Sequence, residues 1–341
     1  MLNIEEKFPL SRERNLVYQN CLTEIGNTPL HKFTEVPILG NNRIFGKLEY
    51  LNPTGSHHIR IYPALFRILE SKKLIYPGIT PIVETSIGNA GAAMVYCANK
   101  LGFNKPSPKV IIPADASKAR IKQITELGGD LIFSPAGRYS EGYVEVLTRM
   151  LDEDKKNKGN LGEDPTRLVA ISKVIPEAKL AYENFVKETV DQLKKLKVSN
   201  IDYFLGAVGS GTSLSGIGRF VKQTWPKSKI VAIEPQEAPV ARYLKDNGKP
   251  LNMKTIPHNV HGVGTYGIPK GKLNIDFNII DQYETFSNDD WCKTLSMVKE
   301  QEGLPIGPST AAVLSVALKY ANRFRDKSIL ICCYDNDWKA V

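Results

Sequence analysis

The feature that most constrains this 341-residue chain is a regular alternation of short apolar runs with segments of helical periodicity. In the first half, strands are predicted at 43–49, 80–84, 109–113 and 130–134, and helices at 59–72, 88–101, 117–127 and 141–154. Glycine and proline separate most of these segments and favour turns between them. Strands that alternate with helices are typical of a parallel sheet covered by helices, so the sequence predicts an α/β fold.

The same alternation resumes in the second half, after a polar stretch. Residues 155–170 contain Gly159, Gly162 and Pro165 and are predicted to form a loop between two lobes. Beyond it, helices are predicted at 176–197, 213–223, 288–302 and 309–323, and strands at 203–205, 229–234, 277–280 and 328–334. Residues 1–22 are expected to form a polar arm, and residues 235–271 to be irregular. We therefore expect a smaller lobe of residues 40–160 and a larger lobe of residues 1–39 plus 161–341.

The composition argues against several classes of protein. The formal net charge is +9, but the lysines are dispersed, which is typical of solvated helix faces rather than of a nucleic-acid-binding patch. No run approaches the roughly 20 apolar residues that cross a bilayer, and the first seven residues lack the pattern of a secretory signal. Five cysteines without a Cys-x-x-Cys pair predict free thiols, with Cys332 and Cys333 buried in a strand. We expect a cytoplasmic protein that binds neither nucleic acid nor membranes.

A sharp turn stands between the strand at 43–49 and the helix at 59–72. Residues 52–60 read Asn-Pro-Thr-Gly-Ser-His-His-Ile-Arg, and the proline and glycine place the following residues at a helix N-terminus. Backbone N–H groups and the helix dipole favour an anion at such a position. The stretch resembles the cofactor-lysine segment, Asn-Pro-Thr-Gly-Ser-x-Lys, of the fold-type II pyridoxal-phosphate enzymes. These include cysteine synthase, cystathionine β-synthase, threonine synthase and the tryptophan synthase β chain, and His58 stands where they have the lysine.

Further matches follow in the order of that family, from about Ile25 to Ala312. The segment Ile-Gly-Asn-Thr-Pro-Leu at 25–30 is similar to one near the start of cysteine synthases. The resemblance implies a two-lobed fold of the tryptophan synthase β type, each lobe with a mostly parallel twisted sheet. It also implies pyridoxal phosphate as cofactor, a small amino-acid-like substrate and a homodimer.

The segment 84–91, Glu-Thr-Ser-Ile-Gly-Asn-Ala-Gly, lies between a predicted strand and a predicted helix. As a local feature it is an ordinary connection in which a hydroxyl side chain caps the helix. It resembles the cysteine synthase loop Thr-Ser-Gly-Asn-Thr-Gly, which implies that Asn89 contacts the cofactor. The same likeness assigns binding of the substrate carboxylate to Thr85, Ser86 and Gly88. The length matches the tryptophan synthase β-chain loop, whose glutamate is catalytic, so Glu84 is predicted to be an acid–base residue.

A glycine-rich loop at 206–213, Gly-Ala-Val-Gly-Ser-Gly-Thr-Ser, follows a predicted strand and opens a helix. Glycines let backbone N–H groups approach a phosphate, and the helix dipole favours the dianion. The loop lacks the Gly-Lys-Ser/Thr ending of a P-loop and the glycine spacing of a dinucleotide-binding fingerprint. It resembles the cup that binds the cofactor phosphate in the family, which implies phosphate contacts from Gly209, Ser210, Gly211, Thr212 and Ser213.

Two later segments complete the predicted site. The turn at 302–312 resembles the family segment that supplies a hydroxyl to the pyridine nitrogen, so Ser309 is the expected partner and Thr310 the second choice. A neutral hydroxyl would leave that nitrogen unprotonated and favour β-elimination or β-replacement. The segment 258–264 resembles a loop that closes one side of the cofactor pocket, which implies a substrate contact from His261. Its two histidines lack a third ligand, so no metal site is predicted.

The histidine at position 58 changes the expected chemistry. Imidazole forms no stable Schiff base with an aldehyde, but it can move protons near neutral pH. We expect a lyase or transferase of amino-acid metabolism that binds pyridoxal phosphate, or its Schiff base with the amino-acid substrate, noncovalently, with His58 and Glu84 as catalytic residues. The alternative is a catalytically inactive cysteine synthase-like protein with a binding or regulatory role. A different phosphorylated ligand, a metal at His57 and His58, and an engineered substitution remain open.

Overall fold

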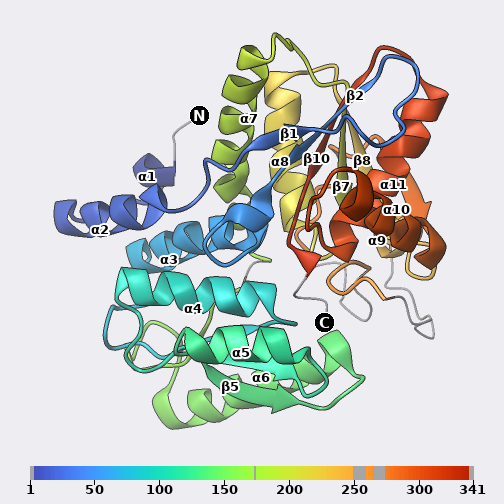
Figure 1. The fold of residues 1–341 in the computed structure, drawn as a ribbon. Coiled ribbons are helices and arrows are strands. Elements are labelled where there is room, and N and C mark those ends of the chain that lie inside the picture. The colour runs from blue at the N-terminus through green and yellow to red at the C-terminus, as the bar shows by residue number, and fades with distance from the viewer. Residues whose placement is uncertain (1–3, 173, 249–258, 265–272, 338–341) are drawn as a thin grey trace. The chain divides into compact units, whose positions relative to one another are not determined.

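The structure is a computed structural model that describes residues 4–172, 174–248, 259–264 and 273–337 (Figure 1). The chain divides into two compact units. Unit 1 comprises residues 1–26 and 52–181, and unit 2 comprises residues 27–51 and 182–340. Each unit is built on its own sheet, as the alternating pattern predicts. No helix in the described part of the chain is long and apolar enough to cross a membrane.

Unit 1 contains a four-stranded parallel sheet in the order β5-β4-β3-β6. Its strands are β3 (Ile82–Thr85), β4 (Lys109–Pro113), β5 (Asp130–Ser134) and β6 (Val169–Ala170). Its helices are α1 (Ile4–Lys7), α2 (Arg12–Thr23), the 3₁₀ turn η2 (His57–Arg60), α3 (Ile61–Ser71), α4 (Asn89–Leu101), α5 (Lys118–Glu126), α6 (Tyr139–Lys158) and most of the 3₁₀ turn η3 (Pro176–Tyr182).

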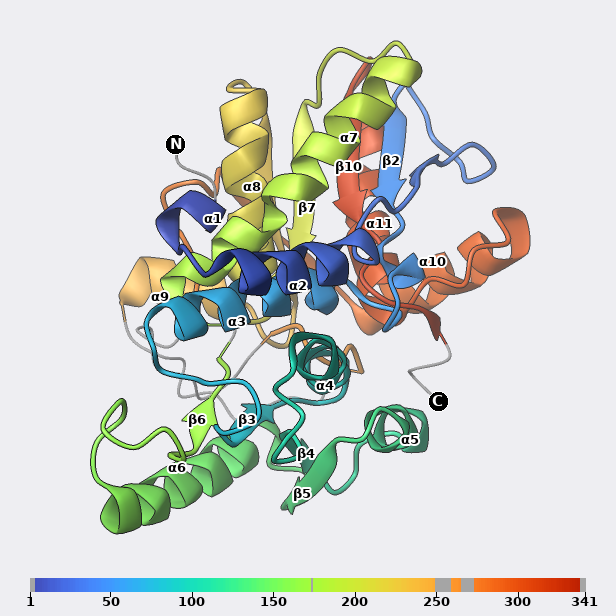
Figure 2. The same ribbon diagram turned by 90° about the vertical axis from the view of Figure 1, so that its left-hand side faces the viewer.

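Helices cover both faces of this sheet (Figure 2). Val83 and Ile111 pack against Val146 of α6 on one face. The neighbouring Val110 contacts Gly91 of α4 on the other face, because successive strand residues point to opposite sides. Both faces of a parallel sheet are therefore buried, which explains why the strands read as continuous apolar runs.

Unit 2 contains a six-stranded sheet in the order β1-β2-β10-β7-β8-β9, in which only β1 is antiparallel to its neighbour. Its strands are β1 (Leu30–Lys32), β2 (Arg43–Lys47), β7 (Tyr203–Ala207), β8 (Lys229–Pro235), β9 (Gln282–Phe286) and β10 (Ser328–Cys332). Its helices are the 3₁₀ turn η1 (Glu49–Leu51), α7 (Glu183–Lys195), α8 (Thr212–Thr224), α9 (Val240–Asn247), α10 (Asn288–Gln301) and α11 (Pro308–Arg323). Cys332 and the following Cys333 are buried, as predicted.

The division of the chain differs from the expected boundaries at 40, 160 and 161. Residues 43–47 form β2, which pairs with β1 and β10 and so belongs to unit 2. At the other end, the expected polar arm is the helix α2, which packs against α3 and α4. Arg14 on α2 donates to Glu70 on α3 over 2.6 Å. This contact explains why a segment with little apolar periodicity still forms an ordered helix.

Three local predictions in the second half are wrong. Residues 155–170, expected to be a loop between two lobes, include the end of α6 and the strand β6 and lie within unit 1. The strand expected at 277–280 lies at 282–286 instead, where Gln, Tyr and Glu occupy the edge of the sheet and obscure the apolar signal. The segment expected to be irregular contains α9, whose N-terminal N–H groups are bound by the Glu234 carboxylate. The remainder of that segment falls largely outside the described residues.

Candidate functional site

The turn at 52–60 is fixed by its own polar groups in unit 1. The Asn52 side chain accepts the Gly26 N–H over 2.9 Å, and the Gly55 N–H donates to the Asn52 carbonyl over 2.7 Å. Gly55 has φ +66°, a conformation that favours glycine. From α5, Gln123 donates to the Thr54 carbonyl over 3.1 Å. Contacts from Gly26 and from Gln123 of α5 therefore hold the turn in place.

His58 lies in the 3₁₀ turn η2, one turn before the α-helix that the sequence places there. Its ring centroid is 4.1 Å from that of His57, and the planes are tilted by 51°. His57 is buried, whereas His58 is partly exposed. The preceding Ser56 hydroxyl is fully buried, and no described residue forms a hydrogen bond with it. A buried hydroxyl of this kind marks a position where a polar ligand atom would be accommodated.

Glu84 is buried at the end of β3 rather than exposed to solvent. The Tyr62 hydroxyl donates to one carboxylate oxygen over 2.8 Å, and the Thr85 N–H donates to the other over 2.8 Å. These bonds fix the orientation of the carboxylate.

The loop that follows Glu84 is closed around one side chain. The Ser86 hydroxyl oxygen accepts the N–H groups of Gly88 and Gly91, both over 2.9 Å. Gly88 has φ +141°, and a Cβ atom there would lie 2.4 Å from Cδ of Arg120. Arg120 also donates to the Ile87 carbonyl over 3.2 Å. The loop therefore has a single tight shape, which ends at Asn89, the first residue of α4.

The glycine-rich loop of unit 2 ends at the N-terminus of α8. Gly211 has φ +86° and precedes Thr212, the first helical residue. A Cβ atom on Gly209 would lie 2.1 Å from the Gly262 carbonyl oxygen, and one on Gly211 would lie 2.1 Å from a side-chain carbon of Ile275. The first N–H groups of α8 have no carbonyl one turn earlier to bond. The two glycines are thus required by close packing against Gly262 and Ile275. The N–H donors at the start of α8 and the hydroxyls of Ser210, Thr212 and Ser213 are groups that fit a phosphate.

Two segments far along the chain support this loop. The Gly264 N–H donates to the Val208 carbonyl over 2.8 Å, so the segment of His261 adjoins the loop, with the His261 side chain exposed. Asn274, which the sequence analysis did not identify, donates its N–H to the Ser210 carbonyl over 2.8 Å. Its side-chain amide lies 3.3 Å from the Thr212 hydroxyl. No local sequence pattern identifies Asn274, because its hydrogen bonds are formed with residues more than 60 positions earlier in the chain.

The Ser309 position is at the start of α11, just after Pro308. Thr310, the second choice, is fully buried, and its hydroxyl accepts the Tyr334 N–H over 3.0 Å. Ser309 is only partly buried, and its hydroxyl donates to the Asp335 carboxylate over 3.3 Å. The hydroxyl expected to meet the pyridine nitrogen therefore already has a partner, the Asp335 carboxylate.

Lys47 is the lysine nearest in sequence to the turn at 52–60. It is fully buried on β2, and its ammonium lies 2.7 Å from Glu188 of α7. It also donates to the Gln192 side chain over 3.1 Å and to the Thr28 carbonyl. The Lys47 ammonium is therefore already bound by groups of unit 2.

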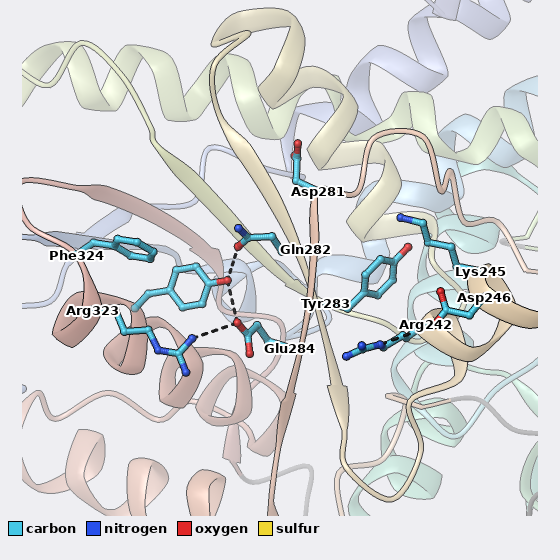
Figure 3. A pocket seen from close by; sticks show the side chains of 10 residues that line it. Arg242, Lys245, Asp246, Asp281, Gln282, Tyr283, Glu284, Arg323 and Phe324 are labelled. Carbon is cyan, nitrogen blue, oxygen red and sulfur yellow. Dashed lines mark hydrogen bonds and ion pairs between the residues drawn. The ribbon is translucent and has the colours of Figure 1, made fainter.

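No group of three or more metal-ligating side chains is found among the described residues, and His258 lies outside them. A depression of about 400 Å³ lies in unit 2, between α9, the edge strand β9 and α11 (Figure 3). It contains none of the predicted site residues. Arg323 pairs with Glu284 over 3.4 Å and Arg242 with Asp246 over 3.8 Å. The charged side chains of this depression therefore pair with one another, and they indicate no particular class of ligand.

Comparisons with known proteins agree with this fold. The family described as "Pyridoxal-phosphate dependent enzyme" matches residues 22–335. Cysteine synthase A of Salmonella typhi is 28% identical over 320 residues, which cover 92% of this chain and 91% of that protein. The structure of an O-acetylserine dependent cystathionine beta-synthase from Helicobacter pylori is similar, with a TM-score of 0.78, 25% identity, and coverage of 94% of this chain and 96% of that one. A hydrogen sulfide-producing enzyme from Fusobacterium nucleatum gives a TM-score of 0.76 and 27% identity, covering 94% and 97%.

Proposed function

This chain belongs to the family of pyridoxal-phosphate-dependent enzymes, and from that membership we propose that it binds pyridoxal phosphate noncovalently and acts on an amino-acid substrate. The reaction is of the β-elimination or β-replacement type, as in a cysteine synthase-like lyase or transferase. The observation that carries the proposal is the loop at 209–213, where two glycines leave no room for a side chain at the N-terminus of α8. Such a loop is suited to a phosphate dianion.

Each proposed residue has a defined task. Gly209, Ser210, Gly211, Thr212 and Ser213 bind the phosphate, and Asn89 and Ser309 orient the ring. Thr85, Ser86 and Gly88 bind the substrate carboxylate, with His261 as a further substrate contact. When bound, the cofactor supplies an electron sink for the substrate α-carbon. The protein's part is to hold and orient the reacting groups and to move protons.

His58 and Glu84 are the proposed proton carriers. An imidazole changes its charge near neutral pH and can take a proton from carbon or return it. Glu84 is fixed by Tyr62 and Thr85, so its carboxylate keeps one orientation during the reaction. Without a lysine at position 58, the cofactor is retained by its phosphate and ring contacts alone. We also propose a homodimer, for which light scattering of the purified protein should give twice the monomer mass.

Absorption spectroscopy tests the proposal. The purified protein is mixed with pyridoxal phosphate and then with single amino acids. A parallel sample is treated with borohydride, and the mass of its chain is measured by mass spectrometry. We expect a cofactor band that changes with one class of amino acid, and no mass added to the chain. Gly209→Ala, which places a Cβ atom against the Gly262 carbonyl, should abolish the band. Cofactor trapped on a lysine would contradict noncovalent binding.

The alternative is a catalytically inactive relative with a binding or regulatory role. The observation that favours it is the replacement of the lysine by His58, combined with a Glu84 carboxylate that the protein itself already binds. A cofactor band that no amino acid changes would support this alternative. Absence of any band would remove the proposed cofactor as well.

A further inference from the structure

The partner of Ser309 suggests a chemical role for a residue outside every motif in the sequence. We propose that Asp335 is a positioning residue that keeps the pyridine nitrogen of the bound cofactor protonated, acting through the Ser309 hydroxyl. This role presupposes the proposed function, because it needs pyridoxal phosphate bound with its ring nitrogen at Ser309. It deepens that function by setting the strength of the electron sink.

Asp335 follows the strand β10 and contacts residues at the start of α11. It is 7% exposed, and its Oδ1 lies 3.3 Å from the Ser309 hydroxyl oxygen. A Cβ atom on Gly307 would lie 2.4 Å from the same Oδ1, so the carboxylate occupies space that only glycine leaves open. The Gly307 N–H donates to the Asp335 carbonyl over 2.9 Å, and the Tyr334 N–H donates to the Thr310 hydroxyl over 3.0 Å. These bonds hold the carboxylate beside Ser309.

The hydrogen-bond inventory of serine determines what Ser309 can offer a ligand. A serine hydroxyl has one proton and two acceptor lone pairs, whereas a carboxylate only accepts. Here the proton is directed to Asp335, because the carboxylate can only accept. Ser309 then presents a lone pair to a ligand, and a lone pair can bond a ring nitrogen only when that nitrogen carries a proton.

The consequence is a stronger electron sink than a lone serine would provide. The nitrogen takes its proton from solvent, and Ser309 links it to the Asp335 carboxylate through one hydroxyl. A protonated ring withdraws more electron density from the substrate α-carbon than a neutral ring does. The competing explanation is purely structural: a carboxylate at a helix N-terminus is favourable without any ligand.

Nitrogen-15 NMR of bound, ring-labelled pyridoxal phosphate in mildly alkaline buffer separates these explanations, because pyridinium and neutral pyridine nitrogens have well-separated chemical shifts. The variants are Asp335→Asn, Ser309→Ala and the control Asp337→Asn. Asp337 lies two residues further along the same segment and pairs with Lys299 over 3.9 Å. Occupancy is checked by equilibrium dialysis and folding by circular dichroism.

We expect a pyridinium shift in the unmodified protein and in Asp337→Asn, and a move toward the neutral shift in Asp335→Asn and Ser309→Ala. If Asp335→Asn does not fold, the nitrogen shift of Ser309→Ala alone tests the proposal, since this variant keeps the Asp335 carboxylate and removes only the hydroxyl that links it to the ring. A neutral shift in the unmodified protein, or a pyridinium shift in both site variants, would overturn the role of Asp335 and leave the proposed function intact. Failure of the unmodified protein to bind the cofactor would overturn both.

Discussion

At the scale of single residues, the proposed mode of cofactor binding depends most on position 58. A primary amine condenses with an aldehyde, whereas an imidazole offers only a proton or a lone pair. The turn around His58 is nevertheless fixed by the Asn52 and Gln123 contacts, neither of which involves the histidine. The backbone that presents this side chain should therefore survive its exchange.

His58→Lys is expected to restore a covalent link to pyridoxal phosphate. Borohydride treatment should then add the mass of one reduced cofactor, and peptide mapping should place it on residue 58. The matched control is His57→Lys, whose side chain replaces a buried ring next to it and should give no adduct on residue 57. An adduct on residue 57 but not on 58 would show that residue 57, rather than residue 58, occupies the position of the family's lysine.

Residues that act through local geometry could be read from the sequence, whereas residues that act through distant partners could not. Gly211, Thr212 and Gly88 lie where a strand meets a helix, and glycine and capping residues mark such junctions. Asn274 and Asp335 contact the site from segments 62 and 26 residues away from their partners. A hydrogen bond between residues far apart in the chain produces no local pattern that can be recognised in a single sequence.

At the scale of elements, the same distinction applies to strands and helices. The buried strand β4 coincides with its predicted range, because a parallel strand covered on both faces is apolar over most of its length. The edge strand β5 also coincides, since three apolar residues, Leu-Ile-Phe, stand between Asp130 and Ser134. The edge strand β9 was misplaced because its sequence, Gln-Tyr-Glu-Thr-Phe, alternates only weakly. Helix α2 was missed because an ion pair to Glu70 and the Tyr18 contact, rather than an apolar stripe, attach it to α3.

The connection between β3 and α4 should tolerate no side chain at Gly88. Gly88→Ala adds a steric conflict with Arg120 to the conformational cost of φ +141°, whereas Gly78→Ala has φ +72° and open space around its Cβ. We expect Gly78→Ala to lower the free energy of unfolding by about 1 kcal/mol, and Gly88→Ala by roughly 2 to 4 kcal/mol. Urea titrations followed by circular dichroism measure both. Equal losses in the two variants would show that Arg120 moves aside without cost.

The connection between β8 and α9 should make stability depend on pH. Burial raises the pKa of Glu234 to about 7, although its oxygens accept the N–H groups of Ala241 and Arg242. The folded pKa exceeds the unfolded one, so the folded state holds more protons between the two values. The free energy of unfolding should then fall as pH rises, by about 2 to 3 kcal/mol between about pH 5 and about pH 8.

Glu234→Gln removes this titration, and its unfolding free energy should change less over the same pH interval. Glu302→Gln is the matched control. Three backbone N–H groups and His31 bind the Glu302 carboxylate, and its pKa is lowered although burial opposes this. It therefore titrates below the interval and should leave the slope unchanged. An equal slope in Glu234→Gln and the unmodified protein would contradict the assignment.

At the scale of the whole molecule, the two units contain different residues of the proposed site. Unit 2 contains the glycine-rich loop, Asn274, Ser309 and Asp335, and it positions them through contacts within itself. Unit 1 contains His58, Glu84 and the loop at 84–91, likewise held by internal contacts. The proposed phosphate recognition thus involves one unit only, and it should be detectable as a change in thermal stability independently of any reaction.

Pyridoxal phosphate should raise the thermal midpoint of the protein, because a ligand that binds only the folded state adds stability by mass action. At roughly 100 times its dissociation constant the gain is about 2.7 kcal/mol, which corresponds to a rise of roughly 3–6 °C for a chain of this size. Pyridoxal without the phosphate, at the same concentration, should raise the midpoint far less, since it cannot use the N–H groups at the start of α8. Gly209→Ala should lose the rise, and Gly78→Ala should keep it, because only the first places a side chain in the loop. An equal rise with pyridoxal and with pyridoxal phosphate would mean that the loop at 209–213 does not bind the phosphate.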